Sequence, residues 1–238
     1  MSAEDSQQPY DTGLMAAVAD LGDALRRLVE TTVTTTVGAD ALRSAAARIR
    51  EVEQRLAVSV RPPTQLPALD DPVAFRRVFN PVTGVGSAVA PPLVMRHEGG
   101  GVVAEATLGV AYEGPPSYLH GGMSALFMDQ VLGAAAIAAG LWGMTVHLGL
   151  DYRRPVPLQT ALVLRAAVTE STGRKVVITG TISLAEAPDQ ALVEARGVFV
   201  TPRPERADEY FGSITDASGQ HSPPGRPSDA TAVADGVE

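Results

Sequence analysis

The sequence predicts an α+β fold in which a mainly antiparallel sheet encloses one long apolar helix, with a helical hairpin ahead of this domain. Three observations lead to this prediction. Apolar residues recur at three- and four-residue steps near the N-terminus, an almost uncharged segment covers Gly121–Trp142, and segments that alternate polar and apolar residues lie on both sides of it. The short turns between those segments favour antiparallel neighbours.

The hairpin consists of two amphipathic helices, predicted over 14–37 and 42–56. Gly38 and Asp40 provide a stop signal and an N-cap between them. The β-branched run TTVTTT weakens the end of the first helix. Such a hairpin serves either oligomerisation or packing on its own domain, and we favour the second. The two apolar stripes are Leu14, Val18, Leu21, Leu25, Leu28 and Thr32, then Leu42, Ala45, Ile49, Val52 and Leu56.

The main domain is predicted as two strands, a helix and four further strands. The first two strands lie in PLVMRHEGGGVVAEATLGVAY, with a turn at Gly99–Gly101, and the helix begins at Gly121. The later strands are MTVHLGLDYRR, ALVLRAAVTE, KVVITGTISLAE and ALVEARGVFVTP, separated by PVP, STGRK and APDQ. In the first of these, one face carries Val146, Leu148, Leu150 and Tyr152, and the other carries Thr145, His147, Gly149 and Asp151.

The composition of the sequence predicts the boundaries of its segments and excludes several classes of function. Five parts are predicted: a flexible N-terminus (1–13), the helical hairpin (14–60), a Pro-rich linker (61–78), the main domain (79–202) and a disordered tail (203–238). A net charge of −8 gives no basic surface for nucleic acid. The absence of cysteine excludes disulfides, thiolate metal sites and a cysteine nucleophile, and with no signal peptide in the N-terminal residues we expect a cytoplasmic protein.

The apolar segment Gly121–Trp142 is long enough to be considered as a transmembrane helix. Asp129 lies within it, and an acid near the centre of a bilayer costs about 3 kcal/mol. We therefore expect no membrane span and a helix enclosed by its own protein. A lone acid in such a segment is disfavoured unless it is paired, protonated, at the surface or in use.

The start of this helix has the chemistry of a carbonyl-binding site. His120 precedes Gly121 and Gly122, and the first amides of a helix have no intrahelical partners. Two glycines allow an oxygen to approach those N–H groups, as an oxyanion hole requires. The plainer interpretation is that the two glycines only ease a tight entry into the helix.

Asp129 and Gly121 cannot serve one carbonyl within a single chain. On one helix they are about 12 Å apart along the axis, whereas a base or nucleophile must lie within about 3 Å of its target. If two copies packed with their helices antiparallel, the oxyanion hole at Gly121 of each copy would face Asp129 of the other. This arrangement predicts a dimer with shared sites. The alternative is a structural acid that is hydrogen-bonded to backbone or to Gln130.

Two segments, YEGPPSYLHGGMSALFMDQVLG and GMTVHLGLDYRRPVPL, resemble the PaaI-type hotdog-fold acyl-CoA thioesterases. The motif E-G-P-P-x-x-x-H-G-G is especially similar to that of the thioesterase superfamily member 4 branch. The resemblance runs from Phe79 to Val200 and leaves out the hairpin and the tail. It implies a hotdog fold that works as a homodimer, often as a dimer of dimers, with each site built from two subunits.

The resemblance also implies roles for particular residues. Asp129 falls on the catalytic carboxylate, which activates water or attacks the thioester itself, and Gly121 falls on the glycine whose amide polarises the carbonyl. His120 falls on the histidine beside that glycine, and Thr145 on the Ser/Thr that positions the water. Many relatives have an Asn six residues before the histidine, where this chain has Gly114.

The resemblance implies acyl-CoA as substrate, free acid and CoA as products, and no metal or redox cofactor. The substrate would approach at Gly122. Arg153 or Arg154 would suit the CoA phosphates, and the alternative is that both are solvated surface arginines. The alternatives are a non-catalytic hotdog protein that binds or senses acyl-CoA and a hotdog dehydratase, although dehydratases lack the HGG-x7-D spacing. Residues that either line an acyl channel or belong to the core are Met123, Phe127, Leu141 and Trp142.

Overall fold

A computed structural model of the chain describes residues 11–71 and 75–222. The helices and strands are α1 (Thr12–Thr34), α2 (Ala39–Leu56), β1 (Met95–Glu98), β2 (Gly101–Thr107), the 3-10 helix η1 (Val110–Tyr112), α3 (Gly121–Ala138), β3 (Met144–Tyr152), β4 (Ala161–Thr172), β5 (Lys175–Leu184), β6 (Ala187–Val200) and α4 (Pro204–Phe211). The predicted α+β class and the predicted order of strands around one long helix are both confirmed.

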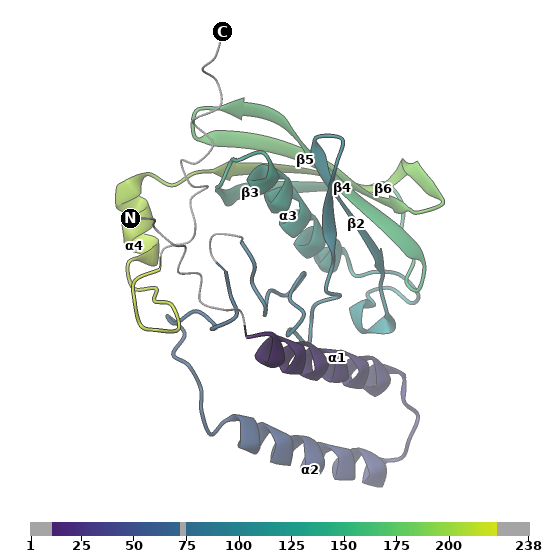
Figure 1. The fold of residues 1–238 in the computed structure, drawn as a ribbon. Helices are drawn as coiled ribbons and strands as arrows, with labels where there is room; N and C mark the ends of the chain where they lie inside the picture. Colours follow the sequence, from purple (N-terminus) through teal and green to yellow (C-terminus); the bar gives the residue numbers. More distant parts are fainter. Residues whose placement is uncertain (1–10, 72–74, 223–238) are drawn as a thin grey trace.

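The six strands form one sheet in the order β1-β2-β4-β5-β6-β3, and every neighbouring pair is antiparallel. The sheet curves around α3, which lies across one of its faces (Figure 1). β1 and β3 are the two edges of the sheet. Because β3 follows α3 directly and lies at an edge, its side chains can reach the helix along the open border of the sheet.

α3 packs closely on the sheet through its large apolar side chains and through two strand glycines. Met128 and Leu132 are fully buried. A Cβ atom at Gly180 would lie 2.6 Å from the Met128 Cε, and one at Gly197 would lie 3.1 Å from the Leu132 Cδ1. Glycine at these positions therefore leaves room for the helix. By length and composition α3 is the one described helix that could cross a membrane, and its packing against five strands is that of a core helix.

β3 departs from the predicted alternation at one residue. Thr145 pairs with Phe199 and His147 pairs with Val198, which leaves Val146 as the extra residue of a β-bulge. Thr145 therefore shares the α3 side of the sheet with Phe199, whose ring belongs to the core. The prediction that Thr145 and His147 share one face is wrong, because a bulge adds one residue to one strand and reverses the order of faces beyond it.

Two element boundaries also differ from the prediction. β6 begins at Ala187, so APDQ is not a turn but the start of the strand, where the pairing with β5 is interrupted and a proline is tolerated. Gly38 is the N-cap of α2, whereas Asp40 lies inside the first turn and forms an ion pair with Arg43. α1 does end within TTVTTT, at Thr34, as the β-branched run suggested.

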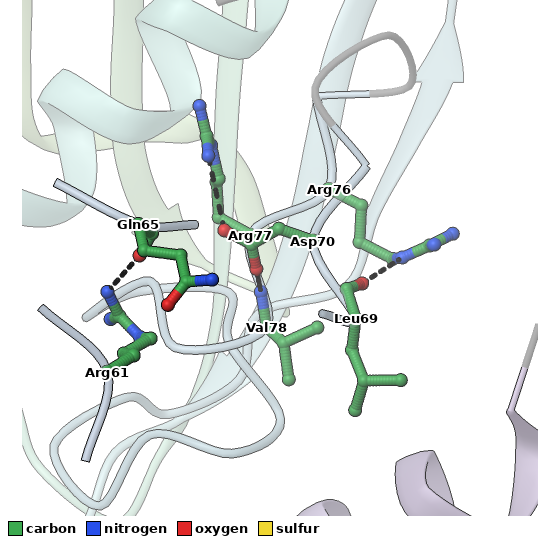
Figure 2. Close-up of polar contacts among 7 residues, drawn as sticks. All are labelled: Arg61, Gln65, Leu69, Asp70, Arg76, Arg77 and Val78. Carbon is green, nitrogen blue, oxygen red and sulfur yellow. Dashed lines mark hydrogen bonds and ion pairs between the residues drawn. The ribbon is translucent and has the colours of Figure 1, made fainter. Parts of the chain in front are cut away.

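The described residues of the predicted Pro-rich linker, 61–71 and 75–78, make contacts with one another and with the core. Leu69 and Val78 are buried. The carboxylate of Asp70 accepts hydrogen bonds from the Val78 N–H at 2.8 Å and from Arg77 at 3.2 Å (Figure 2). Two further hydrogen bonds drawn in Figure 2 join Arg61 to the carbonyl oxygen of Gln65 and Arg76 to that of Leu69.

The prediction of a disordered tail at 203–238 is wrong for its first part. α4 places the ring of Phe211 edge-on to Trp142, with 6.2 Å between ring centroids. Thr215 then pairs with Gln65 and with His221. An aromatic contact between residues far apart in the sequence thus anchors a segment whose average composition is polar. Residues 223–238 of this prediction, like residues 1–10 of the predicted flexible N-terminus, lie outside the described residues.

The two N-terminal helices have different surroundings. α1 contacts the main domain backbone to backbone: Gly22 is buried, and a Cβ atom there would lie 2.2 Å from the Val85 carbonyl oxygen. All of α2 is described, and none of its residues is buried. α2 also lies farther from the sheet than α1 does (Figure 1). α1 therefore packs on its own domain, whereas Ile49 and Leu56 of α2 are about half exposed.

Candidate active site

The first turn of α3 presents one free backbone donor. His120 is the N-cap, and its Nδ1 accepts a hydrogen bond from the Gly122 N–H at 3.0 Å. This bond places the proton of a neutral imidazole on Nε2, which is then a second donor. Among the described residues, the Gly121 N–H has no hydrogen-bond partner. In this geometry the Gly121 amide is open to an incoming acceptor, and its role in binding a carbonyl stays a prediction.

Neighbouring segments fix the position of this turn. The Tyr152 hydroxyl donates to the carbonyl oxygen of Gly121 at 2.8 Å, and the His120 N–H donates to the carbonyl oxygen of Tyr112 at 3.0 Å. The Leu119 N–H donates to the carbonyl oxygen of Val156 at 2.8 Å. The helix start is therefore held by β3, by η1 and by the segment after β3. Tyr152 had no role in the sequence-based site because its contact depends on the fold.

Asp129 lies two turns farther along α3 and is partly buried. The Thr145 hydroxyl donates to its Oδ1 at 2.8 Å, and within the described part of the chain its Oδ2 accepts no hydrogen bond. Gln130 is not its partner: the Gln130 Oε1 accepts from Asn80 at 2.8 Å. The structure thus brings together two of the predicted residues, Asp129 and Thr145, and leaves one carboxylate oxygen open.

The structure does not bring Asp129 and Gly121 together in one chain. Both lie on α3, about 12 Å apart along its axis at about 1.5 Å per residue. Their respective neighbours on β3, Thr145 and Tyr152, lie at opposite ends of that strand. The candidate residues therefore form two half-sites, a donor half at the helix start and an acid half beside Thr145.

Tyr112 connects the donor half to the core. Its ring contacts Phe127 edge-on at 5.8 Å between centroids, and its hydroxyl donates to the Val89 carbonyl oxygen at 3.1 Å. The pKa of Tyr112 is raised to about 12, mainly by burial of its hydroxyl. The charge of Arg26 opposes this rise, and the charge of Glu30 adds to it. The neutral phenol is thus the form this packing favours.

Gly114 is explained by a tight turn. A Cβ atom there would lie 2.7 Å from the Cα of His120, and the Gly114 N–H donates to the Tyr118 carbonyl oxygen at 2.9 Å. In this backbone an Asn at that position would collide with His120. Glycine at position 114 therefore permits the tight turn ahead of the histidine, in which the Ser117 N–H also donates to the Glu113 carboxylate at 2.7 Å.

The remaining predicted residues fall in other surroundings. Arg153 binds Glu194 at 2.7 and 3.1 Å, which raises the pKa of Arg153, and Arg154 donates to Gln190 at 3.3 Å. Since Glu194 points away from the core, Arg153 lies on the outer face of the sheet. Of the apolar candidates, Phe127 is buried in the core, Met123 and Leu141 pack against it, and Trp142 contacts Phe211.

A hollow of about 820 Å³ lies on that outer face, lined by charged residues of both signs that include Arg165, Arg196 and Asp151. None of its lining residues belongs to either half-site. The half-sites themselves are open to solvent in one chain, with His120 and Thr145 exposed.

A six-stranded antiparallel sheet curved around one long helix is a hotdog fold. Residues 117–187 match the profile of the thioesterase superfamily. The chain is similar to a thioesterase superfamily protein of known crystal structure. The similarity covers 77% of this chain and 94% of that protein's chain, with 35% sequence identity and a TM-score of 0.69. The chain belongs to the thioesterase superfamily.

Curated relatives are similar over a shorter range. Acyl-coenzyme A thioesterase THEM4 of Mus musculus is 31% identical over 98 residues, which is 41% of this chain and 42% of that protein. The Xenopus laevis protein of the same name is 39% identical over 64 residues, 27% of this chain and 29% of its own length. The chain thus spans less than half the length of these relatives.

Proposed function

We propose that this protein hydrolyses acyl-CoA thioesters to a free carboxylic acid and CoA. The observation that carries the proposal is the hydrogen bond from Thr145 to Asp129 on the same helix that begins with the free Gly121 N–H. A held carboxylate and a free amide are the two groups that hydrolysis of a carbonyl compound requires. The names of the similar curated proteins support acyl-CoA as the substrate class.

The chemistry follows from the free atoms of each half-site. With its Oδ1 held by Thr145, Asp129 takes a proton from water through Oδ2, and the water oxygen bonds to the thioester carbon. The carbonyl oxygen becomes an oxyanion, which the Gly121 N–H and the His120 Nε2–H stabilise. The C–S bond then breaks, and the CoA thiolate receives the proton. In the alternative route Asp129 attacks the carbon itself, and water hydrolyses the resulting anhydride.

We propose further that each site is shared between two copies of the chain. One copy would supply Gly121 and His120, and the other Asp129 and Thr145, since about 12 Å along α3 exceeds the reach of about 3 Å that proton transfer allows. β3 lies at an edge of the sheet, and an edge strand can pair with the same strand of a second copy. A homodimer, or a dimer of two such dimers, would satisfy this requirement.

Release of free CoA thiol tests the activity. A thiol reagent follows turnover of acyl-CoAs of increasing chain length, and the protein itself adds no thiol signal because the chain has no cysteine. Asp129→Asn should lower kcat by about a thousandfold, while Asp151→Asn, an exposed acid on β3, should match the wild type. Unfolding midpoints report whether each variant is folded. Wild-type kcat in Asp129→Asn would contradict the mechanism, and tight acyl-CoA binding without any turnover would favour a sensor.

A single turnover in ¹⁸O-labelled water separates the two roles of Asp129. With enzyme in excess, general-base catalysis puts the label directly into the acid product. Nucleophilic attack by Asp129 puts an unlabelled oxygen into the first product and leaves the label on the Asp129 carboxylate, provided that water attacks the anhydride at the Asp129 carbon.

A further inference from the structure

We infer that Glu30, on α1 and outside residues 117–187 that match the family profile, is a positioning residue for the donor half-site. Its Oε1 accepts a hydrogen bond from the Val110 N–H at 2.9 Å, and its Oε2 accepts one from the Ala111 N–H at 3.0 Å. Both amides belong to η1, the 3-10 helix that precedes the donor half-site. The catalytic consequence of this inference rests on the proposed function.

The main domain has a socket for this carboxylate. A Cβ atom at Gly109 would lie 2.5 Å from the Glu30 Oε2 and 2.7 Å from its Cδ, so only glycine leaves room for the side chain. Glu30 is partly buried there, and each of its two oxygens binds one amide. Charge-assisted hydrogen bonds of this kind are stronger than neutral ones. Without Glu30, the first two amides of η1 would have no acceptor.

α1 holds Glu30 in place through two further contacts with the domain. One turn before it, Arg26 donates to the carbonyl oxygens of Val85 and Ser87 at 2.8 and 3.0 Å. One more turn back, Gly22 brings the helix backbone against Val85. A rigid helix that is fixed at Gly22 and Arg26 delivers Glu30 to a defined place.

From Glu30 the contacts continue to the start of α3. η1 ends at Tyr112, whose carbonyl oxygen accepts the His120 N–H at 3.0 Å. The Tyr112 ring packs on Phe127 of α3, and its hydroxyl binds the Val89 carbonyl oxygen in the loop that Arg26 also holds. A displacement of η1 would therefore move His120 and, with it, the adjoining Gly121 N–H.

This displacement should affect the transition state more than substrate binding. An oxyanion donor acts on charge that develops during the reaction, so its misplacement lowers kcat and leaves KM nearly unchanged. A side chain that merely stabilised the fold would instead lower the unfolding midpoint without this kinetic signature.

Glu30→Gln tests the inference, because glutamine keeps the shape but turns one acceptor into an NH2 donor that faces an N–H. We expect kcat to fall about tenfold to a hundredfold with KM within about twofold. Asp20→Asn, an exposed acid on α1, is the matched control and should behave as the wild type. Gly109→Ala, which pushes the carboxylate out from the other side, should reproduce the loss.

Amide hydrogen exchange gives a readout that does not depend on turnover. In Glu30→Gln, exchange should accelerate at the hydrogen-bonded amides of Val110, Ala111 and His120 and stay unchanged in β5. If the wild type turns over no acyl-CoA, the proposed function fails, and the exchange pattern alone decides whether Glu30 positions the helix start. Wild-type kcat and wild-type exchange in Glu30→Gln, or accelerated exchange throughout the sheet, would overturn the inference.

Discussion

Gly121 occupies the first position of α3, where the N–H has no intrahelical acceptor and where proline is well accommodated. His120 before it has φ −62° and ψ 131°, the extended conformation that a residue preceding proline adopts. Replacing Gly121 by proline would therefore remove one N–H and keep the helix. The substitution therefore tests the contribution of one hydrogen-bond donor, the Gly121 N–H.

Gly121→Pro should lower kcat by about a hundredfold to a thousandfold, the usual effect of losing one oxyanion donor. Gly121→Ala keeps the N–H, and its Cβ would lie 3.4 Å from the Tyr152 hydroxyl, an ordinary contact, so its kcat should stay within a few-fold of the wild type. Steady-state kinetics with one acyl-CoA and an unfolding curve for each variant check this. Equal rates for the two variants would mean that the N–H is not used.

At the residue scale, sequence reasoning found the groups whose local setting is unusual. A His-Gly-Gly run at a helix start and a lone acid in an apolar segment stand out without any fold. Glu30 and Tyr152 do not, because Glu30 binds amides 80 residues away and Tyr152 binds a carbonyl 31 residues away. A glutamate on an amphipathic helix looks like part of a solvated face until the partner surface is known.

Among the elements, β3 connects the two half-sites of one chain. It contacts α3 through Tyr152 at Gly121 and through Thr145 at Asp129. The second contact exists only because the bulge at Val146 turns Thr145 to the helix side. Alternation predicted the strand itself but not the bulge, since an apolar residue at position 146 suits the regular pattern equally well.

The Thr145 hydroxyl can be removed with little change of shape. Thr145→Val should lower kcat about tenfold, because the Asp129 Oδ1 loses its donor, whereas Thr145→Ser should stay within about twofold of the wild type. Stopped-flow or steady-state release of CoA measures both. If the valine variant keeps the serine variant's rate, the hydrogen bond has no part in turnover.

Elements with a strong internal pattern were predicted well, and those fixed by distant contacts were not. α3 and the alternating strands carry their signal in their own residues. α4 depends on Phe211 meeting Trp142, and the linker depends on Leu69 and Val78 entering the core. Composition alone assigned these last segments to disorder and to a linker.

At the scale of the whole molecule, the proposed sharing of sites between two chains would make activity a property of an assembly. Mixing Gly121→Pro with Asp129→Asn should restore activity, because in a mixed dimer one site receives both defects and the other receives neither. A random mixture should reach about a quarter of the wild-type rate. CoA release after mixing and sedimentation of the mixture measure the rate and the assembly.

Two controls complete this experiment. Each single variant alone should stay inactive. A double variant that carries both Gly121→Pro and Asp129→Asn should stay inactive too when it is treated in the same way. Mixed dimers that form but show no recovered activity would mean that each chain completes its own site.

The fit between Glu30 and Gly109 also bears on how such proteins diverge. Any side chain at position 109 displaces the carboxylate, and a helix without Glu30 leaves the socket unfilled, so the two positions should be inherited together. A descendant that lost α1 would need another acceptor for the amides of η1. Under this inference, gain or loss of the N-terminal helix would be an evolutionary change to the proposed site as well as to the periphery of the molecule.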